Sequence, residues 1–158
     1  VRGRVINMPP PGIPHGGIQA DLASRLIGFV KSRRLGKVVV GSGVILERDP
    51  DTVRAPDISV FLQGDGESTS LPDGYAERMP ELAVEIVSPS DRRPMVRRKA
   101  ESYIAAGVAL VWLIDPRDRT VRVYAAGVEP RDLRADDVLD GGDVVPGFSL
   151  PVADIFAL

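Results

Sequence analysis

The sequence predicts an α/β domain with a mixed central β-sheet flanked by helices. Two mostly apolar runs, residues 82–87 and 108–114, have the length and the β-branched content of buried strands. A segment with helical spacing separates them, so we expect two parallel strands joined by a crossover helix. The chain has only one Trp, three Tyr and four Phe, so the core must be mainly aliphatic, as in a sheet covered by helices.

Size and composition restrict the classes of protein to which the chain can belong. Its 158 residues are enough for one domain, and no linker divides them, so we expect a single domain over residues 1–158. The absence of cysteine excludes disulfides and thiolate metal sites and fits the reducing cytoplasm. No apolar stretch approaches the roughly 20 residues of a membrane helix, so no membrane association is expected. The net charge of -2 argues against nucleic-acid binding by electrostatics alone.

The first half of the chain predicts one helix and several strands. Apolar side chains recur at three- and four-residue spacing through 18–31, which is typical of an amphipathic helix that covers a sheet face. A strand at 1–6 is expected before this helix, and after it a strand at 37–40 and 44–47 that is interrupted around 41–43. A turn at 49–51 then leads to a strand at 55–62 that pairs with the interrupted strand, and a surface loop follows at 63–79. That loop, poor in apolar residues, is either a mobile flap or an ordinary long connection.

The second half is expected to extend the sheet beyond the crossover. Pro94 suits a first helical turn and Gly107 suits a helix end, so the crossover helix should run to about residue 106. The elements expected after it are the strand at 108–114, a turn at 115–118, a strand at 120–125, an edge strand at 144–148 and a final packed turn at 155–156.

One residue does not suit a buried strand. Glu85 lies in the middle of the apolar run 82–87, and burial of an unpaired carboxylate is costly. Either a cation pairs with it or its strand end opens into a polar cleft, and both options indicate a functional site. Asp57 stands at the mouth of another strand, on one face with Ser59 and Phe61. If the two acids converge, they form an oxygen-rich pocket suited to Mg²⁺.

The helix after Glu85 supplies a candidate cation. Its inward stripe is expected to comprise Val96, Ala100, Tyr103 and Ile104. Lys99 lies at the border of this stripe and can lean toward the sheet. A lysine near two carboxylates and a metal-bound water could position the nucleophile or stabilise the charge that develops on a phosphate.

Four stretches together resemble one known family. They are APDISVF around Asp57, PELAVEIVSPSD around Glu85, RRKAESYIAAGVALVWLIDP around Lys99 and the closing PGFSLPVADIF. From about residue 13 to the end, in order and with the expected gaps, they are similar to the Uma-two family of restriction endonuclease-like proteins in the PD-(D/E)xK nuclease superfamily. The resemblance implies a restriction endonuclease-like core, with Asp57 and Glu85 as metal-binding acids and Lys99 as the catalytic lysine. The commonest superfamily pattern has its lysine two residues after the acid, where this chain has Val87, so Lys99 looks like a lysine displaced onto the helix.

Several polar residues keep two interpretations. His15, the only histidine, either touches the site or has a loop or cap role before the first helix. Gln19 either positions a metal-bound water or, as we favour, is an exposed amide. Ser88 and Ser90 either donate to a phosphate or, more in keeping with their sequence, serve turn and capping chemistry.

The remaining candidates are charged or aromatic. Glu81 shares a strand face with Glu85 but is expected at a solvated strand end. A group of arginines follows the Glu85 strand and either binds a nucleic-acid backbone or is simply exposed: Arg92, Arg93, Arg97 and Arg98. Tyr103 and Trp112 are expected in the core.

These observations favour a small Mg²⁺-dependent endonuclease, with Mn²⁺ as an alternative ion. A metal-activated water held between Asp57 and Glu85 would hydrolyse a nucleic-acid phosphodiester, with Lys99 assisting, and DNA is the expected substrate. A homodimer is expected because symmetric enzymes that cut duplex DNA often work as dimers. The alternatives are a noncatalytic binding or assembly module that retains the fold and a metal-dependent hydrolase of another phosphate ester.

Overall fold

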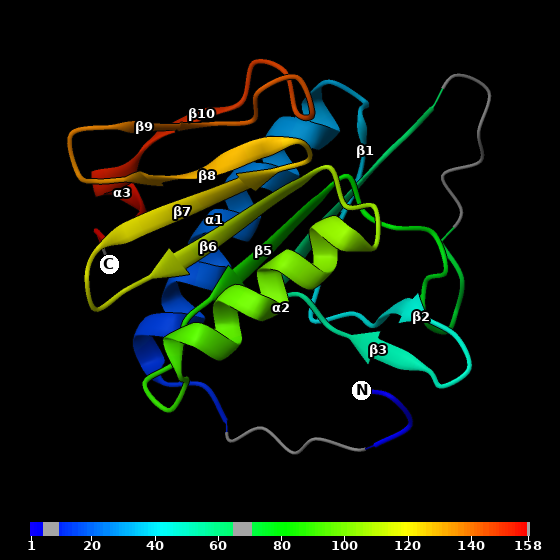
Figure 1. Cartoon of the computed structure of the whole chain (residues 1–158). Helices are drawn as coiled ribbons and strands as arrows, with labels where there is room; N and C mark the ends of the chain where they lie inside the picture. The colour runs from blue at the N-terminus through cyan, green and yellow to red at the C-terminus, as the bar shows by residue number, and fades with distance from the viewer. Residues whose placement is uncertain (5–9, 65–70, 158) are drawn as a thin grey trace.

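A computed structural model describes residues 1–4, 10–64 and 71–157 of the chain. Its main sheet has the strand order β1-β4-β5-β6-β7-β8 (Figure 1). The elements are α1 (Ile13–Ser32), β1 (Gly36–Val40), β2 (Val44–Glu47), β3 (Thr52–Arg54), β4 (Ile58–Leu62), β5 (Leu82–Ile86), α2 (Arg93–Ala105), β6 (Leu110–Asp115), β7 (Thr120–Ala125), β8 (Val128–Leu133), β9 (Val138–Asp140), β10 (Ser149–Pro151) and α3 (Val152–Ile155). The fold is therefore α/β with a mixed central sheet, as the sequence predicts.

The two apolar runs lie side by side at the centre of this sheet. β5 and β6 are parallel, from Leu82 beside Leu110 to Ile86 beside Ile114, whereas the other neighbours in the main sheet are antiparallel. The connection between them runs through α2, which ends just before Gly107. Gly107 has a φ of 104°, a conformation that glycine adopts without steric cost. The predicted crossover is confirmed.

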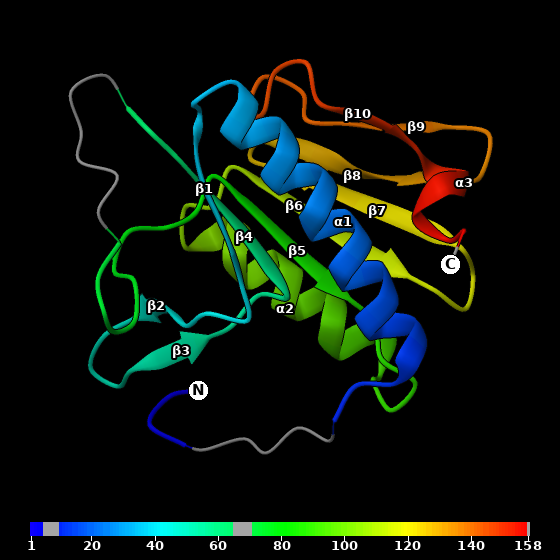
Figure 2. The same cartoon turned by 180° about the vertical axis from the view of Figure 1, so that it is seen from behind.

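Each face of the sheet is covered by one long helix (Figures 1 and 2). α1 contributes Leu26 to a core that includes Ile58, and α2 contributes Tyr103 to a second core that includes Ala83. Successive side chains of a strand point to opposite faces. Glu85, two residues after Ala83, therefore points to the face that α2 covers.

The predicted interrupted strand is two strands in two different sheets. β1 pairs with β4 in the main sheet, whereas β2 pairs with β3 in a separate small sheet. Between β1 and β2, Gly41 has a φ of 61°, which turns the chain away from the main sheet. The turn at 49–51 thus closes the β2–β3 hairpin, and the strand predicted at 55–62 pairs with β1, not with β2, and on its other side with β5.

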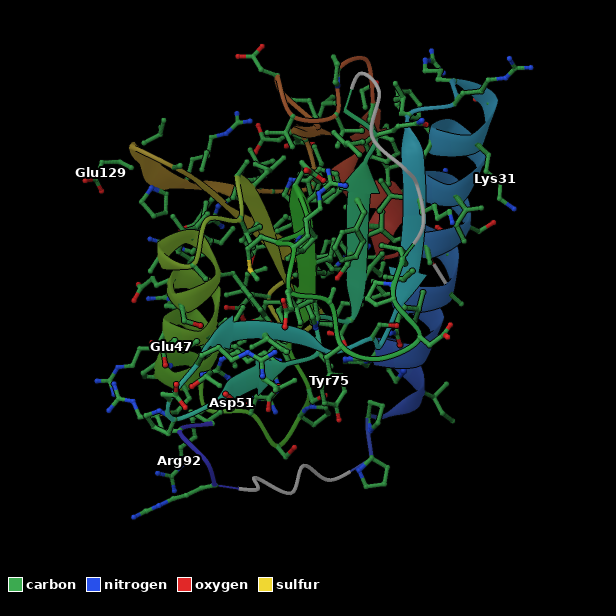
Figure 3. The ribbon with its side chains drawn as sticks, turned by 90° about the vertical axis from the view of Figure 1, so that its right-hand side faces the viewer. Lys31, Glu47, Asp51, Tyr75, Arg92 and Glu129 are labelled. Atoms are coloured by element: carbon green, nitrogen blue, oxygen red, sulfur yellow. The ribbon has the colours of Figure 1, made fainter. Side chains whose placement is uncertain are left out.

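Part of the predicted long loop is anchored to this hairpin. Ala76 bridges to Val44, and Ala76 N donates a hydrogen bond to Gly43 O over 3.0 Å. The ring of Tyr75 lies so close to Gly43 that a Cβ there would be 2.4 Å from the ring. Figure 3 shows Tyr75 beside the hairpin on which Glu47 and Asp51 are labelled. The predicted flap includes residues 65–70, which lie outside the described residues.

The C-terminal tail differs from its prediction. The apolar residues of 144–148 form turns instead of an edge strand, and the edge of the main sheet is β8. Phe148 is buried by stacking on Trp112, with ring centroids 5.7 Å apart, which explains the apolar run without a strand. β8 escaped prediction because Pro130 and its charged neighbours do not resemble a strand interior. Residues 1–4 form a turn rather than the start of a strand.

Candidate active site

The two predicted acids lie opposite each other on neighbouring central strands. Ile58 of β4 pairs with Val84 of β5, so the next antiparallel position sets Asp57 against Glu85 on the same face. Side chains in directly opposite positions have Cβ atoms about 5 Å apart. The backbone N of Ile86 also donates a 2.7 Å hydrogen bond to Asp57 Oδ2. The strand register thus brings the two carboxylates together at the end of the sheet where α2 begins.

Glu85 is buried and held by two side chains of α2. Only 4% of the residue is exposed. Lys99 Nζ lies 2.7 Å from Glu85 Oε2, and the Tyr103 hydroxyl donates a 2.6 Å hydrogen bond to Oε1. Burial raises the pKa of Glu85, and the opposing charge of Lys99 reduces that rise. Burial, together with the charge of Glu85, also raises the pKa of Tyr103, so its hydroxyl remains a donor.

Asp57 is held by two side chains of α1. His15 Nε2 lies 3.2 Å from Asp57 Oδ2, and Gln19 Nε2 donates a 2.8 Å hydrogen bond to the Asp57 carbonyl. The hydrogen bond to Asp57 raises the pKa of His15 despite the opposing effect of burial. His15 belongs to the first turn of α1 and touches the site, because the helix begins five residues earlier than predicted. The favoured prediction that Gln19 is an exposed amide is wrong.

Three buried polar atoms around this site have no hydrogen-bond partner within the described ranges. They are His15 Nδ1, Ser59 Oγ and Arg54 Nε. Ser59 follows Asp57 on the same face of β4, and the charge of Arg54 at the end of β3 reaches Tyr103. Buried polar groups are nearly always hydrogen-bonded in folded proteins. These three atoms are therefore the groups around the site with unused hydrogen-bonding capacity.

The donor set suits a divalent cation that keeps part of its hydration. The hydrogen bonds of the Asp57 carboxylate within the described residues all use Oδ2, which leaves Oδ1 available. In that same part of the chain, no group of three His, Cys, Asp or Glu side chains could enclose a metal. Mg²⁺ is typically held by one or two carboxylates, with waters and substrate phosphates as the other ligands. Asp57 and Glu85 therefore fit Mg²⁺ and do not form a closed metal cage.

The other predicted residues lie outside this constellation. Glu81 accepts a 2.7 Å hydrogen bond from Leu62 N at the far end of β5. The Ser88 backbone donates to Asp91 Oδ2, which is turn chemistry. Arg93 pairs with Asp115 and Asp118, whereas the other three arginines of its group are exposed. Trp112 is buried in the core as predicted.

The family of the chain follows from comparison with known proteins. The family model Uma2, described as "Putative restriction endonuclease", matches residues 1–153. The chain belongs to the Uma2 family. Its matched segment contains the whole site described above. The resemblance predicted from the sequence is thereby confirmed.

The Uma2 fold also has a solved counterpart. A crystal structure from Anabaena variabilis, described as a putative nuclease belonging to DUF820, superimposes with a TM-score of 0.84. The match covers 99% of this chain and 88% of that chain at 24% identity, so it establishes the fold. No curated protein gives a significant match. Within the described residues, no helix is long and apolar enough to cross a membrane.

Tyr103 of this Uma2 protein was predicted only as a core residue, yet it also holds Glu85. We expect Tyr103→Phe to reduce the free energy of unfolding by about 1–2 kcal/mol, because Glu85 loses a buried donor. Urea denaturation measures this loss. Tyr124→Phe is the matched control, since it removes a buried tyrosine hydroxyl that makes no hydrogen bond to Glu85. An equal loss in both variants would mean that the bond between Tyr103 and Glu85 contributes nothing.

Proposed function

We propose that this protein is a Mg²⁺-dependent endonuclease that hydrolyses nucleic-acid phosphodiesters, with DNA as its substrate. The observation that carries the proposal is the opposition of Asp57 and Glu85, with Lys99 Nζ 2.7 Å from Glu85. A buried acid with a raised pKa, a second acid and a lysine are costly to gather without a function. Membership of a family described as restriction endonucleases supports the same class of reaction.

Each residue of the site has a role in this proposal. Asp57 and Glu85 would hold Mg²⁺ or Mn²⁺, which would supply Lewis acidity at the phosphate and lower the pKa of the attacking water. Lys99 stabilises the negative charge that develops on the phosphate. His15 and Tyr103 position the two acids through the contacts described above. Arg54 binds a phosphate oxygen with the guanidinium atom that lacks a partner.

The displaced lysine is compatible with this chemistry. Val87, where the commonest superfamily pattern has lysine, is 5% exposed and packs in the core beneath α2. Lys99 reaches the same carboxylate from the helix above it, and 15% of its side chain remains exposed. Its ammonium group is therefore anchored by Glu85 and is still accessible to a ligand.

We also propose a homodimer in the cytoplasm. Cleavage of both strands of a duplex is commonly achieved by two symmetric copies of an enzyme. The absence of cysteine suits a reducing compartment that contains nucleic acid. Sedimentation of the protein with and without duplex DNA tests the dimer.

The competing proposal is a noncatalytic module that retains the fold. It is favoured by the saturation of Glu85, because both carboxylate oxygens already have partners on α2. Such a network can serve structure alone. The two proposals differ in whether Mg²⁺ and Mn²⁺ should stabilise the protein and support cleavage.

We expect Mg²⁺ and Mn²⁺ to raise the melting temperature and to support cleavage of single- or double-stranded DNA. Asp57→Asn should abolish both effects, because a ligand that binds only the native state stabilises it by linkage. Differential scanning fluorimetry and gel assays of DNA and RNA substrates provide the measurements. Glu81→Gln is the control, as an acid at the opposite end of β5. Stabilisation that survives in Asp57→Asn would contradict the proposed metal site.

A further inference from the structure

A second charged pocket lies beside the site, between the start of α2 and the strands β6 to β8. Its volume is about 140 Å³. One water occupies about 30 Å³ of liquid, so the pocket has room for a phosphate group. Four arginines and three aspartates line it, namely Arg93, Arg97, Arg122, Arg134, Asp115, Asp118 and Asp132. No role in the proposed reaction has been given to any of them.

Each aspartate of this pocket is paired with one of two arginines, and these five side chains together carry one negative charge. Arg93 pairs with Asp115 over 3.1 Å and with Asp118 over 2.7 Å. Arg122 pairs with Asp132 over 2.8 Å. With the remaining two arginines the pocket has a net charge of +1, from four arginines against three aspartates.

Arg97 and Arg134 provide that surplus charge. Neither guanidinium group makes a hydrogen bond or ion pair with another residue of ranges 1–4, 10–64 and 71–157. They reach the pocket from different elements, Arg97 from α2 and Arg134 from the residue after β8. Arginine donors suit phosphate oxygens, which they bind through charge-assisted hydrogen bonds. The free cations of the pocket thus match an anion with several oxygens.

The pocket is aligned with the two acids across the sheet. Glu85 of β5 lies beside Leu113 of β6, which pairs with Arg122 of β7, so all three share one face and one row. Leu113 and Arg122 line the pocket. Two strand spacings of about 4.8 Å separate β5 from β7, or about 10 Å. Because phosphates follow one another at close intervals along a nucleic-acid strand, a backbone that passes the two acids can place a neighbouring phosphate at this pocket.

We infer that this pocket binds a backbone phosphate of the nucleic acid whose scissile bond lies at Asp57 and Glu85. This inference rests on the proposed nuclease function, for which it names a second contact with the substrate. Arg97 and Arg134 supply the charge, and the Arg93 and Arg122 ion pairs hold the walls of the pocket. The overall acidity of the chain is then compatible with nucleic-acid binding, because the positive charge is local.

The test is binding of a fluorescently labelled oligodeoxynucleotide, measured by anisotropy in a chelating buffer that prevents cleavage. Arg97→Gln and Arg134→Gln should each raise Kd by about fivefold and reduce the salt slope by about 0.7 for a single strand. The matched control is Arg98→Gln, which removes an equally exposed arginine of α2 that does not line the pocket. Its Kd should remain close to that of the wild type.

The outcomes separate this inference from the proposed function. Equal effects of Arg97→Gln and Arg98→Gln would overturn the pocket even if the protein cleaves DNA, as would failure of the wild type to bind any oligonucleotide. Loss of affinity specific to Arg97 and Arg134 supports the pocket even if no cleavage is found. A third arm measures thermal stability during titration with inorganic phosphate. Stabilisation by phosphate that depends on Arg97, together with an oligonucleotide affinity that Arg97→Gln leaves unchanged, would identify a free-phosphate site and overturn the backbone contact.

Discussion

Glu85→Gln is expected to reduce DNA cleavage by about 10³-fold without unfolding the protein. The rate falls because the substitution removes one of the two carboxylates proposed to bind the metal, and a bound metal supplies several kcal/mol of transition-state stabilisation. The fold persists because glutamine has the same shape and can still accept the Tyr103 hydrogen bond. The relief of burying the Glu85 charge offsets part of the loss of its ion pair with Lys99, so the melting temperature should fall only modestly.

Cleavage rates and thermal unfolding of the same preparations measure this separation of activity from stability. Glu81→Gln is again the control, because it changes an acid on the same strand face that pairs with Arg78 away from the site. Both proteins should melt near the wild-type temperature, and only Glu85→Gln should be inactive. A Glu85→Gln protein that retains full activity but melts at a much lower temperature would favour the noncatalytic module.

The parts of the fold that the sequence predicts well are those governed by local pattern. β5, α2 and β6 follow from two apolar runs and a helical repeat, with Pro94 and Gly107 as boundaries. The separation of β1 from β2 could not be predicted, because an apolar strand interrupted by glycine looks the same whether it bulges or leaves the sheet. That choice is decided by pairing with β3 and β4, which is not local.

The residues of the site also divide into those that a local sequence pattern indicates and those that it does not. Glu85 is conspicuous because a carboxylate interrupts an apolar strand, and Lys99 lies at the border of a helical stripe. Arg54 and Ser59 give no such signal, since an arginine at a strand end and a serine within a strand are ordinary. Their importance comes from buried atoms without partners, which only the three-dimensional arrangement reveals. The contact of His15 with the site could not be predicted because the helix was expected to begin after His15, whereas it begins at Ile13.

These residues come from separate segments that converge at one end of the sheet. α1 supplies His15, the β3–β4 segment supplies Arg54 and Asp57, β5 supplies Glu85 and α2 supplies Lys99. Rigid helices and strands hold groups more accurately than loops do. The contacts of Asp57 with α1 and of Glu85 with α2 therefore couple the position of one acid to α1 and that of the other to α2.

Lys99→Met is expected to have a double effect, on catalysis and on the pH dependence of stability. Cleavage should fall by about 10²-fold, because the phosphate loses a cation equivalent to a single oxyanion donor. At neutral pH the free energy of unfolding should also fall, by about 2–3 kcal/mol, because Glu85 is left buried without its counter-charge. Methionine retains the apolar stem, so the packing of α2 on the sheet changes little.

The sign of the pH effect follows from Glu85. Its pKa in the folded protein is already above the ordinary value of 4.5, and loss of Lys99 raises it further. Between the ordinary pKa of the unfolded chain and the raised pKa of the folded variant, the native state binds a proton that the unfolded state does not. The free energy of unfolding must therefore increase as pH falls through this range. Urea denaturation from neutral to acid pH should therefore show the Lys99→Met deficit shrinking, whereas Arg98→Met, exposed on the same helix, should follow the wild type throughout. A deficit that is constant with pH would mean that Lys99 acts through packing and does not balance the charge of Glu85.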